Sequence, residues 1–88
     1  MRISTKKRER IIEQILLFLY NSFPKQPFTA EIAREVARDE EFIKKMLHEL
    51  KEKDLVTPIK KNKEGVSFSR RIKWTLTKKV YDLYHSKQ

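Results

Sequence analysis

Few residues of this 88-residue chain could do chemistry, and their types exclude most kinds of active site. The absence of cysteine excludes thiolate catalysis, disulfides and the common cysteine-containing zinc sites. The two histidines are His48 and His85, and His48 with Glu52 is more typical of a solvated i,i+4 pair than of a metal site. The single glycine excludes phosphate-binding loops that need several. We therefore expect no enzyme activity, cofactor, metal or small-molecule ligand.

The net charge of +9 makes nucleic acid the leading partner, because a duplex is a dense line of phosphates. The charge is uneven along the chain. Residues 1–10 carry about +4 and residues 57–79 about +7, whereas residues 29–56 carry about −2. We therefore expect phosphate contacts mainly from the two basic flanks.

Three acids interrupt this basic chain at Asp39, Glu40 and Glu41. A helix N-terminus accounts for them, with Asp39 as the cap and the glutamates facing the positive end of the helix dipole, worth about 0.3–1 kcal/mol each. On a helical wheel the residues after Asp39 also present a mixed-charge outer face. In a major groove a lysine of this face would bind guanine, Glu41 would accept from cytosine and Phe42 would contact a thymine methyl. The base-reading candidates are Glu41, Phe42, Lys44, Lys45 and His48.

Basic residues of the two flanks are the candidates for contacts to the DNA backbone. They are Arg2, Lys6, Lys7, Arg8, Lys60, Lys61, Lys63, Arg70, Arg71 and Lys73. A solubilising tail would also explain the basic N-terminus, and a solvated hairpin would explain the second group. The sequence leaves both alternatives open.

Three helices must position these side chains. Apolar residues at helical spacing predict the first over about residues 5–23, and Pro24 and Pro27 prevent its continuation. Thr29 is the expected N-cap of a second helix over about residues 30–37. The third begins after Asp39 and runs to about residue 53, with Ile43, Met46, Leu47 and Leu50 as its buried stripe.

The apolar period changes from 3.6 to 2 after Leu55. Alternation over residues 66–76 predicts a strand, and Gly65 ends a polar turn that joins it to a first strand over residues 55–60. Pro58 cannot donate to a ladder, so the first strand should lie at a sheet edge and the Trp74 strand at the centre. A short extended piece around Phe28 and a last helix over about residues 77–86 complete a mainly α fold with a small antiparallel β hairpin.

Residues 32–56, IAREVARDEEFIKKMLHELKEKDLV, resemble the helix, tight turn and recognition helix of a winged helix-turn-helix domain of the small bacterial and archaeal transcriptional-regulator type. The basic hairpin is similar to the wing. The resemblance implies one domain over residues 1–88 with a basic arm over about residues 1–8, and DNA binding by the third helix and the wing. Ala37 and Asp54 stand where many relatives have glycine; Asp54 can adopt the left-handed conformation, whereas Ala37 predicts a slightly different turn.

The apolar residues of the first helix cover about 200° of a helical wheel, whereas an ordinary surface helix buries about 100° or somewhat more. A helix deep in the core explains this breadth, and so does a two-fold dimer. We favour the dimer. Its interface candidates are Ile11, Leu17, Phe18, Tyr20, Val80, Leu83 and Tyr84.

These patterns favour a DNA-binding transcriptional regulator that acts as a homodimer on double-stranded DNA. The acidic middle leaves open an adaptor module that binds protein in transcription, replication or translation machinery, and an RNA binder would have a similar basic surface. The sequence has no apolar run long enough for a membrane span and no signal-peptide pattern, so we expect a cytoplasmic protein. Its abundant Lys, Glu and Ile resemble thermophile composition.

Overall fold

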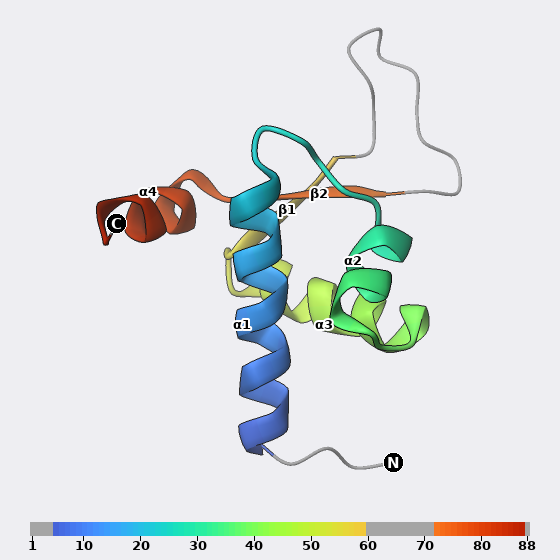
Figure 1. The fold of residues 1–88 in the computed structure, drawn as a ribbon. Coiled ribbons are helices and arrows are strands. Elements are labelled where there is room, and N and C mark those ends of the chain that lie inside the picture. The colour runs from blue at the N-terminus through green and yellow to red at the C-terminus, as the bar shows by residue number, and fades with distance from the viewer. Residues whose placement is uncertain (1–4, 60–71, 88) are drawn as a thin grey trace, which may run out of the picture.

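The computed structural model describes residues 5–59 and 72–87, which form four helices and a two-stranded antiparallel sheet (Figure 1). The helices are α1 (Thr5–Ser22), α2 (Thr29–Val36), α3 (Glu40–Glu52) and α4 (Lys78–Ser86). The strands are β1 (Val56–Ile59) and β2 (Lys73–Leu76). This confirms the predicted fold class. In Figure 1, α1 stands between α4 on one side and α2 with α3 on the other.

The first helix follows the predicted apolar stripe. Its buried residues are Ile11, Ile15, Leu16 and Leu19. The helix ends at Ser22, one residue before the predicted end. There the N–H of Lys25 donates to the carbonyl of Ser22 at 2.7 Å, which closes a turn around Pro24.

The predicted N-cap of α2 is wrong by one residue. Phe28, in extended conformation, occupies the cap position, and its N–H donates to the Glu31 carboxylate at 3.0 Å. Thr29 is instead the first helical residue, and its Oγ1 accepts the indole N–H of Trp74 at 2.8 Å. The Thr29 hydroxyl therefore binds a distant side chain rather than the helix end that follows it.

The turn between α2 and α3 differs from our expectation for Ala37. Ala37 adopts the left-handed conformation itself, with φ 59° and ψ 47°. In this geometry the N–H of Arg38 donates to the carbonyl of Ala33 at 3.0 Å and ends α2 at Val36. The turn is therefore the usual left-handed one, formed by a residue whose Cβ opposes it. Asp54 after α3 is also left-handed, with φ 62°, as predicted.

Ala37→Gly is expected to raise the free energy of unfolding by about 0.5–1 kcal/mol. Glycine removes the Cβ clash of the left-handed conformation, and its greater freedom in the unfolded chain offsets only part of that gain. Urea denaturation measures the change. Ala30→Gly is the matched control. Because Ala30 lies within α2, this substitution should lower the free energy of unfolding by about 1 kcal/mol. A loss for both variants would contradict the conformation of Ala37.

The sheet has the predicted arrangement around Trp74. β1 pairs antiparallel with β2, and Pro58 lies opposite Trp74. On the other side of β2, Phe28 forms an isolated bridge with Lys73, and the N–H of Trp74 donates to the carbonyl of Pro27 at 2.9 Å. The Trp74 strand is therefore central among the described residues. The predicted extended piece around Phe28 is a single bridge and not a strand, and residues 66–71 of the predicted strand lie outside the described residues.

The last helix begins at Lys78, one residue later than predicted, with Thr77 as its cap residue. The Thr77 hydroxyl donates to the carbonyl of Asp54 at 3.1 Å, which ties the start of α4 to the end of α3. Val80 is the buried residue of this helix. Of the helices in the described parts of the chain, none is both long and apolar enough to span a membrane.

Candidate nucleic-acid interface

The N-terminus of α3 has the cap that its three acids predict. The Asp39 carboxylate accepts from the N–H of Phe42 at 3.1 Å, which satisfies one of the free donors of the first turn. Glu40 and Glu41 follow in that turn and are exposed. The acids therefore stabilise the helix start, and their carboxylates remain accessible.

The two faces of α3 separate as the helical wheel predicts. The buried residues are Ile43, Met46, Leu47 and Leu50. Four of the five base-reading candidates are exposed, namely Glu41, Lys44, Lys45 and His48. The fifth, Phe42, is half-buried against the core. The outer face of α3 can therefore meet a partner without unfolding the domain.

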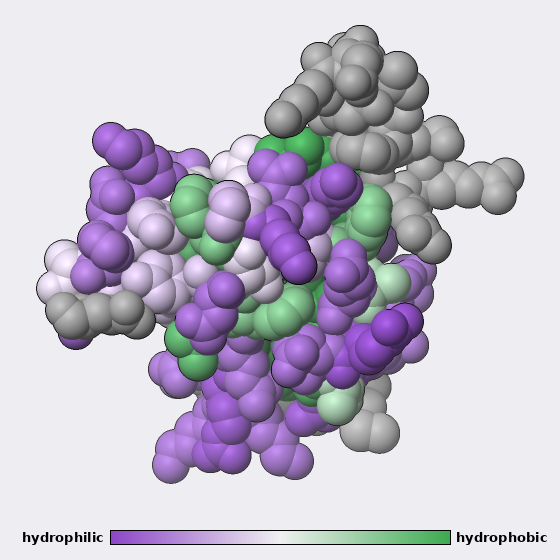
Figure 2. All heavy atoms as spheres, turned by 45° about the horizontal axis from the view of Figure 1, so that its top comes forward, coloured by the Kyte–Doolittle hydropathy of each residue, from purple (hydrophilic) through white to green (hydrophobic). Residues whose placement is uncertain are grey.

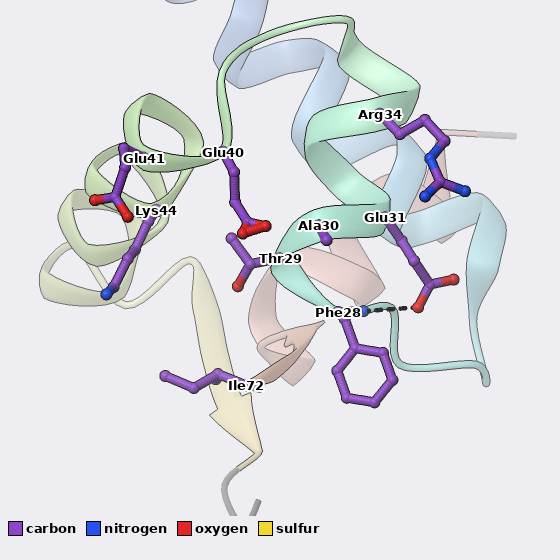
Figure 3. A pocket seen from close by; sticks show the side chains of 9 residues that line it. All are labelled: Phe28, Thr29, Ala30, Glu31, Arg34, Glu40, Glu41, Lys44 and Ile72. Carbon is purple, nitrogen blue, oxygen red and sulfur yellow. Dashed lines mark hydrogen bonds between the residues drawn. The ribbon is translucent and has the colours of Figure 1, made fainter. Parts of the chain in front are cut away.

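A recess lies between the starts of α2 and α3 and the residue before β2. Figure 3 shows Glu41 and Lys44 on α3 and Ile72 across from them. Glu40 extends from α3 toward Thr29 at the start of α2. Two of the base-reading candidates, Glu41 and Lys44, thus share one recess, whereas Lys45 and His48 do not line it.

The recess carries charges of both signs. Besides Glu41 and Lys44 it is lined by Glu31 and Arg34 of α2. The Glu31 carboxylate already accepts from the backbone of Phe28. Sequence reasoning missed Glu31, Arg34 and Ile72 as neighbours of Glu41, because only the chain path brings these separate segments together.

His48 contacts the core as well as solvent. Its ring meets the ring of Trp74 nearly at right angles, at 88°, with centroids 5.8 Å apart. Trp74 has no exposed surface. Among the exposed candidates of α3, His48 is therefore the one held against the sheet by a ring contact.

Three solved structures show what this arrangement is similar to. MepR of S. aureus in complex with DNA gives a TM-score of 0.68 at 19% identity, over 96% of this chain and 54% of MepR. ZitR of Lactococcus lactis, a zinc-responsive MarR family member, gives a TM-score of 0.61 at 19% identity, over 99% of this chain and 56% of the ZitR chain. A proposed DNA-binding protein of Ralstonia eutropha gives a TM-score of 0.69 at 17% identity, over 89% of this chain and 94% of that protein. The chain has a winged-helix fold.

The winged-helix similarity concerns the fold, because the identities are 17–20%. This chain spans between 54% and 62% of the MepR chains it matches. No protein-family model matches the sequence, and neither does any curated protein.

The predicted phosphate contacts of the wing lie mostly outside the described residues. This applies to Lys60, Lys61, Lys63, Arg70 and Arg71, and to Arg2 of the arm. Lys73 is described, and its ammonium lies 5.2 Å from the centroid of the Phe28 ring at the base of the winged-helix hairpin. Its charge is therefore placed beside the recess.

The rest of the basic arm belongs to the first turn of α1. Lys6 and Lys7 are exposed. The Arg8 guanidinium forms an ion pair with the Glu49 carboxylate of α3. Both partners of this pair are well exposed, so it is weak and a phosphate can compete with it.

The predicted dimer residues divide among three places. Ile11 and Val80 are only 2% and 5% exposed, so the prediction is wrong for these two, which belong to the chain's own core. Leu17, 53% exposed, and half-buried Phe18 line a furrow between α1 and α2. The breadth of the α1 arc is therefore partly explained by burial within the chain.

The remaining candidates, Tyr20, Leu83 and Tyr84, lie on α1 and α4. Tyr20 contacts the rings of Tyr81 and Tyr84, with centroids 5.2 Å and 5.5 Å away. Phe23, which was not among the predicted interface residues, is 51% exposed, and its ring centroid lies 4.5 Å from that of Tyr81. We call Tyr20, Phe23, Tyr81 and Tyr84 the α1–α4 aromatic surface. Leu83 of α4 is 53% exposed. Figure 2 shows hydrophobic residues as separate small areas among hydrophilic ones on the face it displays.

Burial in this surface raises the pKa of the Tyr84 phenol above its ordinary value, and the nearby charge of Glu13 adds to the rise.

Proposed function

We propose that this protein is a DNA-binding transcriptional regulator that places α3 in the major groove and the basic wing on the phosphate backbone. The observation that carries the proposal is the exposed pair of Glu41 and Lys44 beside the base of the wing, in a fold shared with MepR, which was solved in complex with DNA. The net charge of +9 supports it, since phosphate contacts dominate affinity for duplexes. Such a protein has no catalytic role and acts in the cytoplasm.

Base reading follows from the two side chains in the recess. A carboxylate in the major groove can only accept hydrogen bonds. The cytosine N4 amino group donates one and has no acceptor beside it on the same base, so it is the best partner for a carboxylate. An ammonium favours guanine O6 and N7. Residues 41 and 44 lie on the same side of α3, about 4.5 Å apart along its axis, so their side chains can reach different base pairs. We therefore propose that Glu41 and Lys44 recognise two adjacent G·C pairs, with Lys45 as a further base contact.

Glu41→Gln is expected to raise affinity for random DNA and to reduce the preference for the selected site by about 1–3 kcal/mol, which is the discrimination of one good base contact. The substitution removes the negative charge, which lowers repulsion of phosphates, and it leaves cytosine a neutral amide oxygen, which is a weaker acceptor than the carboxylate. Selection of binding sites, followed by affinity measurements on selected and random duplexes, tests both effects.

Glu52→Gln is the matched control, because Glu52 is an exposed acid at the other end of α3 and does not line the recess. It should change both affinities in parallel. If Glu41→Gln behaves like Glu52→Gln, then Glu41 does not read a base.

We also propose that the protein is a two-fold dimer formed through the α1–α4 aromatic surface and the exposed Leu83 of α4. Leu83→Lys with Phe23→Lys is expected to shift sedimentation from dimer to monomer at micromolar concentration, because two charges would have to be buried. The wild-type site should then be a pseudo-palindrome with half-sites about one helical turn apart.

Leu17→Lys is the control for the dimer, since Leu17 is equally exposed but lines the α1–α2 furrow. A wild-type protein that sediments as a monomer at high concentration would remove the proposal. Dissociation by Leu17→Lys alone would move the interface to the furrow.

A protein-binding adaptor is the second candidate function. It is favoured by the three carboxylates of Glu31, Glu40 and Glu41 around the recess, which repel phosphates. Salt-titrated binding to duplex DNA, single strands and structured RNA separates these functions. Duplex binding with a steep salt dependence supports the regulator, preference for RNA replaces DNA as the partner, and absence of binding to all three supports the adaptor.

A further inference from the structure

Trp74 joins the strand that leads out of the wing to the first helix of the helix-turn-helix. It is the chain's single tryptophan and has no exposed surface. Its Nε1–H donates to the hydroxyl of Thr29, the first residue of α2, at 2.8 Å. The backbone of the same region adds two bonds, from Trp74 to Pro27 at 2.9 Å and from Thr29 to Ile72 at 3.3 Å. The start of α2 is therefore attached to β2 by side chain and backbone together.

The same indole also contacts the second helix. The His48 ring, from the middle of α3, packs edge to face with it at a centroid distance of 5.8 Å. His48 is exposed on its outer side. One buried side chain thus touches both helices of the helix-turn-helix from the strand next to the wing.

We infer that Trp74 is a positioning residue that holds α2 and α3 at a set angle to β2, and that His48 acts on DNA binding through Trp74 rather than by contacting a base. This inference rests on the proposed function. It also reassigns His48, which the sequence placed among the base-reading residues.

Contacts to base edges and contacts to phosphates differ in how much displacement of the protein they tolerate. Hydrogen bonds to base edges weaken steeply when donor and acceptor move, so α3 must be held closely. Attraction between wing cations and phosphates depends on charge and survives small displacements. Removal of the Trp74 contacts should therefore reduce sequence preference while the salt dependence of binding stays unchanged.

Two substitutions at His48 separate positioning from base reading. His48→Phe keeps a ring against Trp74 and cannot hydrogen-bond a base, whereas His48→Gln keeps hydrogen-bonding groups and lacks the ring. We expect His48→Phe to retain the ratio of specific to random affinity within about twofold, and His48→Gln to lower it roughly 2- to 10-fold, the equivalent of one aromatic contact. The reverse order, or an equal loss in both variants, overturns the inference.

A double-mutant cycle tests whether the effect passes through Trp74. Thr29→Val removes the acceptor for the indole with little change of shape. Its effect on the specificity ratio should be non-additive with that of His48→Ala, because both residues contact Trp74. Lys45→Ala is the matched control on the same helix and should be additive with Thr29→Val. Trp74 fluorescence, from the one indole in the chain, verifies that each variant is folded.

The outcomes are distinct. Additivity for both pairs, or non-additivity in stability without any in specificity, overturns the inference and leaves the proposed function in place. If the parent protein binds no duplex, the proposed function fails and the inference fails with it.

Discussion

Trp74→Ala is expected to lower the free energy of unfolding by about 3–5 kcal/mol, as measured by urea denaturation. Trp74 is fully buried between the sheet and the helices, so the substitution leaves a cavity that the surrounding backbone cannot fill. It also removes the partner of the Thr29 hydroxyl. Because a domain of this size has a total stability of about 5–15 kcal/mol, the variant should be close to unfolded.

Two further variants separate the causes of this loss. Thr29→Val leaves the indole N–H without an acceptor and should cost about 1–3 kcal/mol, less than the cavity. Leu17→Ala removes a large side chain that is 53% exposed and lies outside the proposed dimer interface, and it should stay within about 0.5 kcal/mol of the parent. Equal losses for Trp74→Ala and Leu17→Ala would contradict the central position of Trp74.

Replacement of Lys61, Lys63, Arg70 and Arg71 by alanine is expected to weaken binding to every duplex. The slope of log affinity against log salt should fall by about 0.9 for each phosphate that is no longer neutralised, hence by up to about 3.6 for four phosphates. These residues lie outside the described part of the chain, and the prediction rests on the concentration of positive charge in residues 57–79. Fluorescence anisotropy over a series of salt concentrations measures the slope.

The control uses lysines of α4 and the residue after it, because Figure 1 places α4 across α1 from α3. Lys78, Lys79 and Lys87 replaced together by alanine should change the slope by less than the effect of one phosphate, about 0.9. If both multiple variants lower the slope in proportion to the charge removed, general attraction and not the wing holds the duplex. If neither does, nucleic acid is the wrong partner.

Local sequence patterns determined the helices and much of the exposed surface. The apolar period predicted that Ile43 and Leu47 are buried, and the same period placed Lys45 on the outer face. Asp39 was predicted as a cap because its oxygen binds an N–H only three residues away. Pro58 marked the edge strand because it lacks a ladder donor. In each case the cause lies within a few residues of the effect.

Tertiary structure decided the roles that depend on distant neighbours. Thr29 was predicted as a helix cap, but its hydroxyl instead accepts a hydrogen bond from the indole of Trp74, 45 residues later. Ile11 and Val80 were predicted at an interface because their side chains are apolar, but both are buried in the chain's own core. Ala37 adopts a left-handed conformation that its Cβ opposes, because the packing of α2 on α3 requires that turn. Periodicity reports which side chains avoid water, whereas the partner that shields each one is set by long-range packing.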